Sequence, residues 1–406
     1  MNSPPKPPTA INSRGHPTKF QQIIQEKSQN FVGREFVFRA INNFLHRHNQ
    51  GYFSIIGAPG SGKSAILAKY VTNNPQVIYY NAELEGKNRA DEFLINICTQ
   101  LINQYSLNYI SLPDNATEGS WFFSSLLQQI SDELEPHQQL IIAIDGLNWI
   151  DRNSQPPGTN LFYLPRYLPD GVYFLLTRRP FLREKSGLLI ETPSQSLDLA
   201  NYPEENRQDI QAYIQNHLTL LPCEGKEGQD YSPAILGERS NLKSWLSNHQ
   251  INEQEFCVDA EQLALGHRLT TLSENNFMYV SQVISAIAEN FYPIPFQYNQ
   301  PPPGLEAYYQ QHLHKMFPPE QDTKHSTDVL HVLIQQQKAI SVLAQTAAGI
   351  AQIIDTDEYE VEEVLENWLE FLQKQQIALK THYSLYHSNF RDWLGRQQIK
   401  PSKKTP

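Results

Sequence analysis

A glycine-rich loop between a short apolar stretch and a helical pattern constrains this chain more than any other feature. The run Gly57-Ala58-Pro59-Gly60-Ser61-Gly62-Lys63-Ser64 follows the apolar residues 52–56 and precedes a helix-forming stretch that starts at Ala65. In such a unit the backbone N–H groups of the loop point at phosphate oxygens, and the helix adds the positive end of its dipole. The spacing predicts that Lys63 reaches the β and γ phosphates and that Ser64 offers its hydroxyl to Mg²⁺. We therefore expect residues 57–65 to bind a nucleoside triphosphate.

A second apolar stretch ends in a carboxylate. Residues 140–144 are all apolar, and Asp145 follows them. Such a run is typical of a central parallel strand that is buried on both faces, and these sheets bind ligands at the carboxyl ends of their strands. Phosphate-binding loops of this type are accompanied by an aspartate that holds the Mg²⁺ shell. The expected metal ligands are therefore Ser64 and Asp145.

The residues after Asp145 do not provide an obvious catalytic base. They read Gly146-Leu147-Asn148-Trp149, and the next carboxylate is that of Asp151. Hydrolysis needs a group that orients the attacking water and takes its proton. Asn148 can orient a water molecule, but an amide cannot accept the proton. The sequence therefore predicts slow turnover, or a base brought from elsewhere such as Asp151.

A third apolar stretch runs into two arginines. Residues 171–177 have a strand pattern and lead into Arg178-Arg179-Pro180. An arginine at the carboxyl edge of such a strand can form a charge-assisted contact with the γ phosphate, and this contact is lost on hydrolysis. The alternative is a pair of solvated surface arginines. The position of this strand relative to the other two favours a nucleotide sensor.

Composition narrows the classes of function. The chain has 406 residues, enough for two or three domains, and its net charge of −11 argues against nucleic acid as a partner. Three cysteines are too scattered for a metal site or a disulfide framework, which fits a reducing cytosol: Cys98, Cys223 and Cys257. The N-terminus has no apolar signal core, and no run is long enough to span a bilayer. We therefore expect a cytoplasmic protein without a membrane partner.

The pattern along the chain predicts an α/β protein with several domains. Strands alternate with helices around the glycine loop, which is typical of a doubly wound parallel sheet of the P-loop NTPase fold. Further on, apolar residues over 361–372 have helical spacing, and residues 377–385 form a predicted hairpin. The expected units are a flexible proline-rich leader (1–28), a P-loop nucleotide-binding domain (29–195), a helical lid domain (196–318), a winged-helix domain (325–397) and a flexible tail (398–406).

In their order along the chain, these motifs resemble those of STAND-class signalling ATPases of the NACHT and AAA-like type. The resemblance covers residues 31 to 397 and rests on the glycine loop, the Asp145 strand, Phe31-Val32-Gly33-Arg34-Glu35, Thr177-Arg178-Arg179-Pro180, Asp209-Ile210-Gln211-Ala212-Tyr213-Ile214, Asn275-Asn276-Phe277-Met278-Tyr279 and Tyr386-His387-Ser388-Asn389-Phe390-Arg391-Asp392. In such proteins a nucleotide-binding domain, a helical domain and a winged-helix domain close over ADP. Exchange for ATP opens them for oligomerisation. The resemblance thus implies an ATP/ADP-binding, Mg²⁺-dependent signalling switch that forms a homo-oligomer with ATP.

The resemblance also implies roles for single residues. It places Val32, Gly33 and Arg34 near the adenine and ribose, and it makes Arg179 the nucleotide sensor. It further implies that His387 donates a hydrogen bond to the ADP phosphate and locks the closed state. The alternative is that His387 is only packed or solvated beside its aromatic neighbours.

Two departures from the family pattern matter. The usual Asp-x-x-Asp-Glu series reads Asp145-Gly146-Leu147-Asn148-Trp149 here, which weakens the expectation of hydrolysis. The sequence also has neither a repeat array that senses a ligand nor an N-terminal effector domain. We therefore expect either the switch core of a larger or split system, or a sensor or effector on another polypeptide.

Two other functions remain open from the sequence. DNA-associated AAA-type loaders and transposition ATPases also join a glycine-loop domain to a winged helix, although the acidic charge argues against DNA binding. Salt-sensitive DNA binding with a steep slope would support that alternative. A nucleotide-binding scaffold without turnover would bind ATP and ADP with no change in shape or assembly.

Overall fold

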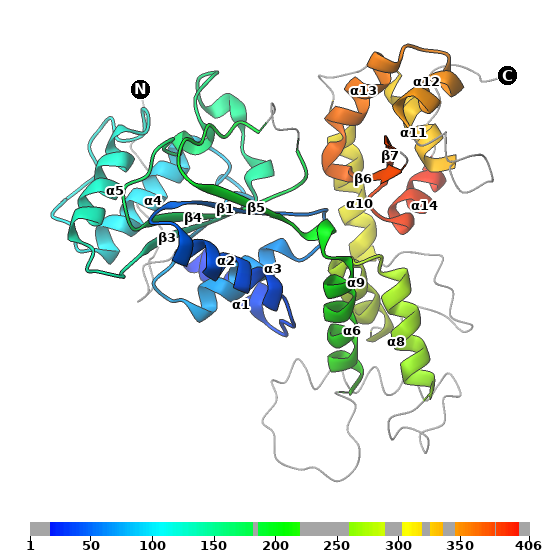
Figure 1. Cartoon of the computed structure of the whole chain (residues 1–406), viewed down its shortest axis with the longest axis horizontal. Coiled ribbons are helices and arrows are strands. Elements are labelled where there is room, and N and C mark those ends of the chain that lie inside the picture. The colour runs from blue at the N-terminus through cyan, green and yellow to red at the C-terminus, as the bar shows by residue number, and fades with distance from the viewer. Residues whose placement is uncertain are drawn as a thin grey trace, which may run out of the picture. The chain divides into compact units, whose positions relative to one another are not determined.

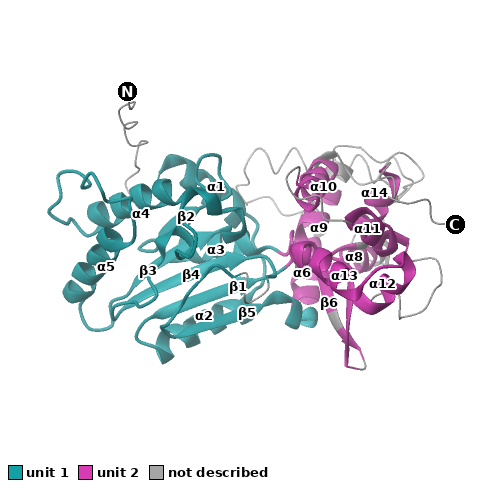
Figure 2. Ribbon diagram, turned by 90° about the horizontal axis from the view of Figure 1, so that it is seen from above, with its two compact units in different colours: residues 1–57, 62–205 teal, residues 58–61, 206–406 magenta. Residues whose placement is uncertain are grey.

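The computed structural model describes residues 17–181, 186–219, 260–288, 303–318, 325–335, 346–377 and 379–397. The chain divides into two compact units, which Figure 2 shows in different colours. The first comprises residues 1–57 and 62–205, and the second comprises residues 58–61 and 206–406. Residues 58–61 of the glycine loop are thus grouped with the second unit. Each unit has a hydrophobic core of its own.

A five-stranded parallel sheet runs through the first unit. Its strands lie in the order β2-β3-β4-β1-β5. They are β1 (Gly51–Ile56), β2 (Ile78–Asn81), β3 (Leu140–Asp145), β4 (Val172–Arg178) and β5 (Ser194–Asp198). The strand β3 is buried over its whole length, as expected of an apolar run between two layers of helices. The predicted α/β fold class with a doubly wound parallel sheet is therefore confirmed.

Helices cover both faces of this sheet, as Figure 1 shows. On one face lie α4 (Ala90–Gln104) and α5 (Trp121–Glu133); on the other lie α1 (Thr18–Ser28), α2 (Glu35–Arg47) and α3 (Lys63–Asn73). The sheet therefore exposes its loops, rather than its faces, to ligands. The carboxyl ends of β1, β3 and β4 meet at one edge because all three strands are parallel.

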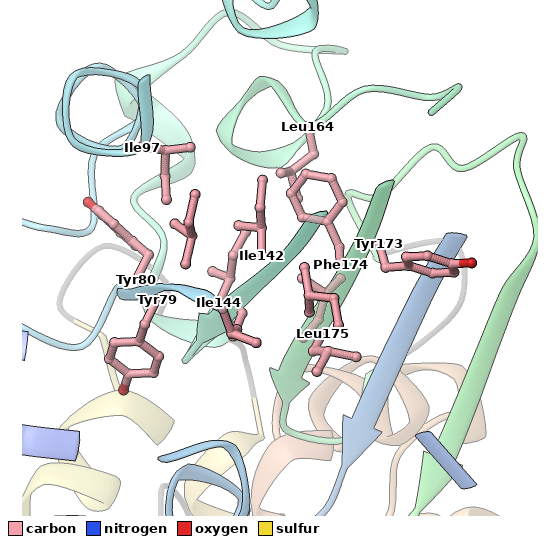
Figure 3. Packing of buried hydrophobic residues seen from close by; sticks show 14 of the residues in the cluster. Tyr79, Tyr80, Ile97, Ile142, Ile144, Leu164, Tyr173, Phe174 and Leu175 are labelled. Carbon is pink, nitrogen blue, oxygen red and sulfur yellow. The ribbon is translucent and has the colours of Figure 1, made fainter. Parts of the chain in front are cut away.

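Aromatic residues fill the core on both faces of the sheet. Tyr52 of β1 stacks on Phe174 of β4 with ring centroids 4.9 Å apart. Their chain neighbours Phe53 and Tyr173 point to the opposite face, where both contact Phe44 of α2. Figure 3 shows the same alternation in β2, because one of its two tyrosines points toward α4 and the other away from it. The helices on each face are thus packed against a separate layer of rings.

The segment before the first predicted helix differs from the prediction. The sequence predicts a flexible leader up to residue 28, but residues 18–28 form α1 and bury Phe20 and Ile24. The ring of Phe20 lies 5.8 Å from that of Tyr79 and 5.4 Å from that of Tyr80. Two buried side chains on a mostly polar helix give little local signal. Packing against the sheet therefore stabilises this helix.

The expected loss of strands past residue 192 also differs from the structure. The sequence pattern loses its strands beyond residue 192, yet residues 194–198 form β5, which pairs in parallel with β1. Only Leu197 is buried in this strand. An edge strand with one buried residue has no apolar alternation to detect.

Helices dominate the described part of the second unit. They are α6 (Pro203–Thr219), α8 (Ala260–Leu272), α9 (Phe277–Ala288), α10 (Pro303–Met316), α11 (Ser326–Gln335), α12 (Ala347–Ile354), α13 (Glu358–Asn367) and α14 (Ser388–Arg396). The strands β6 (Leu372–Ile377) and β7 (Lys380–Leu385) form an antiparallel pair. A helical region and a C-terminal antiparallel hairpin are thus present. The winged-helix identity of the C-terminal part and the predicted domain borders stay predictions.

The helical spacing over residues 361–372 extends further than the helix itself. The helix α13 ends at Asn367, and Leu372 opens β6. At this boundary the indole Nε1 of Trp368 donates a 2.8 Å hydrogen bond to the carbonyl of Met316 in α10. The buried Trp368 ring also contacts Phe317. These long-range contacts end the helix and direct the chain into the hairpin.

Candidate functional site

The glycine loop joins β1 to α3, as the sequence predicts. Gly60 and Gly62 have φ angles of +79° and +90°, a left-handed backbone that glycine adopts without strain. Gly62 is also the N-cap of α3, whose first N–H groups have no partners within the helix. The N–H of Gly57 donates to the carbonyl of Arg178 at 3.3 Å, which anchors the start of the loop to β4. The loop therefore lies at the carboxyl edge of the sheet with the geometry of an anion site.

Lys63 folds back on this loop. Its Nζ donates a 2.8 Å hydrogen bond to the carbonyl of Gly57. Burial, together with the positive charge of Arg179, lowers the pKa of Lys63 to about 7. Three carboxylates oppose this shift: Asp145, Glu83 and Asp198. Burial and Arg179 thus make the charged form of Lys63 unfavourable without a ligand. Phosphate oxygens, which are negatively charged, would bind this ammonium favourably.

Asp145 lies in a cluster of hydrogen bonds at the end of β3. Its Oδ1 accepts from the hydroxyl of Ser64, at 3.2 Å, and from that of Thr177. Its Oδ2 accepts from the hydroxyl of Tyr79 and the amide of Asn81, both at 3.5 Å. Asp145 is 1% exposed. These four donors are uncharged, so they orient the carboxylate without neutralising it.

Ser64 and Asp145 together fit Mg²⁺. A hydroxyl and a carboxylate oxygen 3.2 Å apart are hard oxygen ligands on neighbouring elements. Mg²⁺ is usually held by one or two carboxylates, with substrate phosphates and water as its other ligands. When bound, it would neutralise part of the phosphate charge.

The two arginines after β4 have different surroundings. Arg178 donates through Nη1 and Nη2 to the hydroxyl and carbonyl of Ser186, at 3.0 and 2.8 Å. Arg179 is 6% exposed and lies 5.5 Å from the ring centroid of Trp149, and its charge acts on Lys63. Neither is a solvated surface arginine. Arg179 is the one whose charge acts on Lys63, and its role as a sensor stays a prediction.

The two residues predicted to assist hydrolysis differ in their surroundings. Asn148 lies in the 3₁₀ turn Leu147–Trp149, and its Nδ2 is buried without a hydrogen-bond partner among the described residues. A buried donor of this kind can hold a water molecule or a phosphate oxygen. Asp151 instead caps the next turn, because its Oδ1 accepts from the N–H of Asn153 at 3.0 Å. Asn148 is therefore better placed to act on a ligand than Asp151.

The predicted adenine-binding segment has an unusual backbone. Gly33 and Arg34 both have positive φ angles, of 69° and 67°. Arg34 is the N-cap of α2 and is 2% exposed, with its guanidinium 5.9 Å from the ring centroid of Phe36. Val32 is partly buried just before them. Contact of these residues with adenine and ribose stays a prediction.

His387 belongs to the second unit, where both of its ring nitrogens have partners. Nδ1 accepts from the N–H of Asn389 at 3.1 Å and thereby caps α14. This assigns the proton to Nε2, which donates to the carbonyl of Ser273 at 3.0 Å. Burial lowers the pKa of His387, so the ring is neutral. A bond to an ADP phosphate would need Nε2 to leave Ser273, and it stays a prediction.

Asn276 contacts the glycine-loop residues that belong to the same unit. Its Nδ2 donates to the carbonyl of Pro59 at 2.9 Å, while its Oδ1 caps α9 by accepting from the N–H of Tyr279 at 3.0 Å. The N–H of Met278 donates to the carbonyl of Gly60 at 3.2 Å. A Cβ atom at Gly60 would lie 2.2 Å from the Asn276 Oδ1, so this contact requires a glycine there. The start of α9 thus holds two peptide groups of the loop.

Five residues at the site were not predicted as functional from the sequence: Asn81, Glu83, Thr177, Asp198 and Asn276. Three of them lie at the carboxyl ends of parallel strands, which meet at one edge of the sheet: Asn81 and Asp198 are the last residues of β2 and β5, and Thr177 is the last but one of β4. Their position at the ends of strands could therefore have indicated these three residues. Glu83 lies in the loop after β2, and Asn276 contacts residues more than two hundred positions away. Sequence spacing contains no signal for contacts of that kind.

We expect nucleotide binding to be coupled to proton uptake at Lys63. The pKa of about 7 leaves this lysine mostly neutral at pH 8, whereas a bound triphosphate favours the ammonium. Binding at pH 8 should therefore take up about one proton, and affinity should fall up to about tenfold for each pH unit above 7. Calorimetry at pH 8 in two buffers of different ionisation enthalpy measures this uptake. Identical apparent enthalpies would contradict the lowered pKa.

The stability of the ligand-free protein should respond to pH in the opposite way. Between pH 7 and 10.5 the unfolded chain holds more protons at this lysine than the folded chain does. The contribution of Lys63 to the free energy of unfolding therefore rises with pH across that window.

Comparison with known proteins finds a similarity within the first part of the chain. Residues 30–169 match the family model of the AAA ATPase domain. These residues are similar to ATPase domains of the AAA type. No curated protein matches the sequence. The STAND or NACHT class is not identified by these matches.

Among the matching solved structures, three overlap most of this chain at low sequence identity. The Walker-type ATPase PABY2304 of Pyrococcus abyssi is 13% identical, with 90% of this chain and 96% of that chain covered and a TM-score of 0.46. Drosophila ORC bound to DNA is 11% identical, with 90% and 94% covered and a TM-score of 0.41. A single-residue variant of Thermotoga maritima RuvB is 11% identical, with 89% and 96% covered and a TM-score of 0.34. The expectation that nucleic acid is not a partner finds no support in these comparisons.

Within the described part of the chain, no helix combines the length and the apolar character needed to cross a membrane.

Proposed function

We propose that the protein is an ATP/ADP-binding molecular switch of the STAND type that hydrolyses ATP slowly. The observation that carries this proposal is the contact of Asn276 and Met278 with the carbonyls of the glycine loop. Phosphates bind to the N–H groups of the same loop, so the nucleotide and α9 act on the same peptide units. A change of nucleotide should therefore change the position that α9 prefers. This coupling supports a switch rather than an enzyme whose only task is turnover.

Each residue of the site has a task in this proposal. Lys63 and the loop N–H groups bind the phosphates, and Ser64 and Asp145 would hold Mg²⁺. Arg179 contacts the γ phosphate and so distinguishes ATP from ADP. A nucleotide can shift the population of closed and open forms only by its difference in affinity for the two. The contact of Arg179 is one such difference, because ADP lacks the γ phosphate.

The assembly state in different nucleotides tests the proposal. We expect the full chain to run as a smaller species with MgADP and as a homo-oligomer with a non-hydrolysable MgATP analogue. Light scattering after size-exclusion chromatography measures the mass, and extraction identifies the nucleotide that the purified protein retains. An assembly and a shape that ignore the nucleotide would support the scaffold function instead.

Asn276→Ser is expected to uncouple nucleotide binding from assembly. Serine keeps a side-chain oxygen that can cap α9, but it is too short to donate to the carbonyl of Pro59. The variant should bind nucleotide within about threefold of the wild type, because about one neutral hydrogen bond is lost. Its mass should no longer differ between ADP and the ATP analogue. The same light-scattering measurement decides this.

A matched change elsewhere in the second unit controls for loss of a helix cap. Asp357 caps α13 by accepting from the N–H of Tyr359 at 2.8 Å. Asp357→Ser should leave the nucleotide dependence of the mass intact. If both variants lose it, general destabilisation rather than the loop contact is responsible.

A DNA-associated ATPase of the AAA type is the second candidate. The hairpin β6–β7 favours it, because residues 372–385 include two exposed lysines, Lys374 and Lys380, and no acidic residue. A local basic patch can bind phosphates even on an acidic protein. Duplex DNA binding that weakens steeply with salt would support this function, and its absence at low salt would exclude it.

A further inference from the structure

The strand next to Asp145 ends with a carboxylate close by. β2 pairs in parallel with β3, and Asn81 lies level with Asp145 at the ends of the two strands. The N–H of Ala82 still donates to the carbonyl of Asp145 at 3.0 Å, so the pairing continues past the end of β2. Glu83 is the next residue. It therefore emerges at the same edge of the sheet as the predicted Mg²⁺ ligand.

The side chain of Asn81 fixes this arrangement. Its Oδ1 accepts from the N–H of Glu83 at 2.8 Å, which turns the chain directly after the strand. Its Nδ2 donates to the hydroxyl of Tyr79 at 3.2 Å and to the carboxylate of Asp145 at 3.5 Å. Asn81 is 3% exposed, so the amide has little freedom. One buried side chain thus positions Glu83 relative to Asp145.

Glu83 lies against the residue that follows Asp145. A Cβ atom at Gly146 would be 3.6 Å from the backbone nitrogen of Glu83 and 3.7 Å from its Cβ. Glu83 is exposed, whereas Asp145 is buried. The charge of Glu83 nevertheless acts on Lys63. The carboxylate therefore lies on the solvent side of the site, within electrostatic reach of the phosphate-binding lysine.

The other two carboxylates that act on Lys63 accept hydrogen bonds from nearby groups. Asp145 accepts from Ser64 and Thr177. Asp198 caps the turn after β5, because its Oδ1 accepts from the N–H of Ala200 at 3.0 Å. Glu83 is positioned through its backbone, because its N–H donates to the Oδ1 of Asn81 at 2.8 Å.

We propose that Glu83 is the general base of ATP hydrolysis, the role that the sequence after Asp145 does not fill. The inference rests on the proposed function, since it requires ATP at the glycine loop. The oxygen of a water molecule forms a bond to the γ phosphorus as the bond to the β,γ-bridging oxygen breaks. Glu83 takes a proton from that water and releases it to solvent, and ADP and inorganic phosphate leave. The buried Nδ2 of Asn148 can hold the water by donating to its oxygen.

Glu83→Gln tests the proposal, because glutamine keeps the size of the side chain but cannot accept the proton. We expect steady-state ATP turnover to fall by about 100-fold or more, the usual contribution of a positioned base. Affinity for a non-hydrolysable ATP analogue should stay within about threefold, since Glu83 is not a phosphate ligand. Protein incubated with MgATP and then desalted should retain ATP in the variant and ADP in the wild type. This last readout reports the bound species rather than a rate.

Glu85→Gln is the matched control, because Glu85 is also exposed and lies two residues further on. It should turn over ATP within about twofold of the wild type, as surface changes usually do. Glu83→Asp keeps the charge and shortens its reach, so it should keep the affinity and lose most of the turnover. This variant decides the question if glutamine lowers the melting temperature.

The outcomes separate this inference from the function on which it rests. Wild-type turnover in Glu83→Gln would overturn Glu83 as the base. A wild-type protein that binds ATP but never hydrolyses it would overturn the base and leave the nucleotide switch intact. A wild-type protein that binds no nucleotide would overturn both.

Discussion

Lys63→Ala is expected to weaken binding of ATP and ADP by about 100-fold or more. The side chain is the cation of the loop, and its Nζ already lies 2.8 Å from the carbonyl of Gly57 at the base of the loop. A charge-assisted hydrogen bond contributes about 1.5–3 kcal/mol, and a lysine that bridges two phosphates makes two of them. At about 1.4 kcal/mol for each factor of ten, this loss corresponds to at least two orders of magnitude. Titration of a fluorescent nucleotide measures it.

The same variant should not be less stable without nucleotide. Lys63 is a cation whose pKa burial and Arg179 lower, so its charge opposes folding below about pH 7. Alanine removes that charge and no core side chain. The melting temperature of the ligand-free protein should therefore stay the same or rise. A large fall would mean that lost binding reflects unfolding.

Lys69→Ala is the control on the same helix. Lys69 also lies in α3, but six residues later, so it faces away from the loop. Affinity should stay within about twofold of the wild type, as for other changes away from a site. Near-normal binding in Lys63→Ala would contradict the phosphate-loop assignment.

Asp145→Asn is expected to abolish the effect of Mg²⁺ on nucleotide binding. It should also reduce turnover by about 100-fold or more, because the enzyme loses the metal ion that stabilises the phosphoryl group during transfer. The amide keeps the shape of the side chain and one carbonyl oxygen for Ser64 and Thr177. It removes the negative charge that Mg²⁺ requires. Binding of ADP in the presence of a chelator should be little changed. Titrations with and without Mg²⁺ separate the two effects.

Asp151→Asn removes the same charge six residues later and is the matched control. Asp151 caps a 3₁₀ turn through its Oδ1, and the asparagine oxygen can keep that bond. Mg²⁺ should still raise the affinity of this variant. If Asp151→Asn loses the Mg²⁺ effect and Asp145→Asn keeps it, the metal ligand has been assigned to the wrong aspartate.

The fold class was predictable because its signals are local. The apolar run before Asp145 and the stretch before Arg178 have the composition of buried parallel strands, and both are strands in the structure. The helix α1 and the strand β5 were missed because each buries few side chains: Phe20 and Ile24 in one, Leu197 in the other. Packing against the sheet stabilises them, and packing partners far along the chain leave no periodic signal.

The residues of the candidate site also divide into those that a local sequence signal indicates and those that only the fold brings together. A phosphate loop is one continuous segment whose glycines, lysine and serine have a required spacing, so Gly60, Gly62 and Lys63 could be assigned directly. Asp145 followed from the need for a carboxylate at the end of a buried strand. The loop conformation itself supports the assignment, with positive φ angles at both glycines.

The sequence by itself determined that this chain has a parallel α/β domain with a phosphate-binding loop and an aspartate at the strand edge, because each is encoded by neighbouring residues. Only the tertiary structure decided which distant groups join them. It brought Glu83 beside Gly146 through the pairing of β2 with β3, and it turned Asp151 toward its own backbone. It also placed Asn276 on the carbonyl of Pro59. Such contacts depend on strand order and helix packing, which bring together residues whose separation in the sequence carries no information about their proximity.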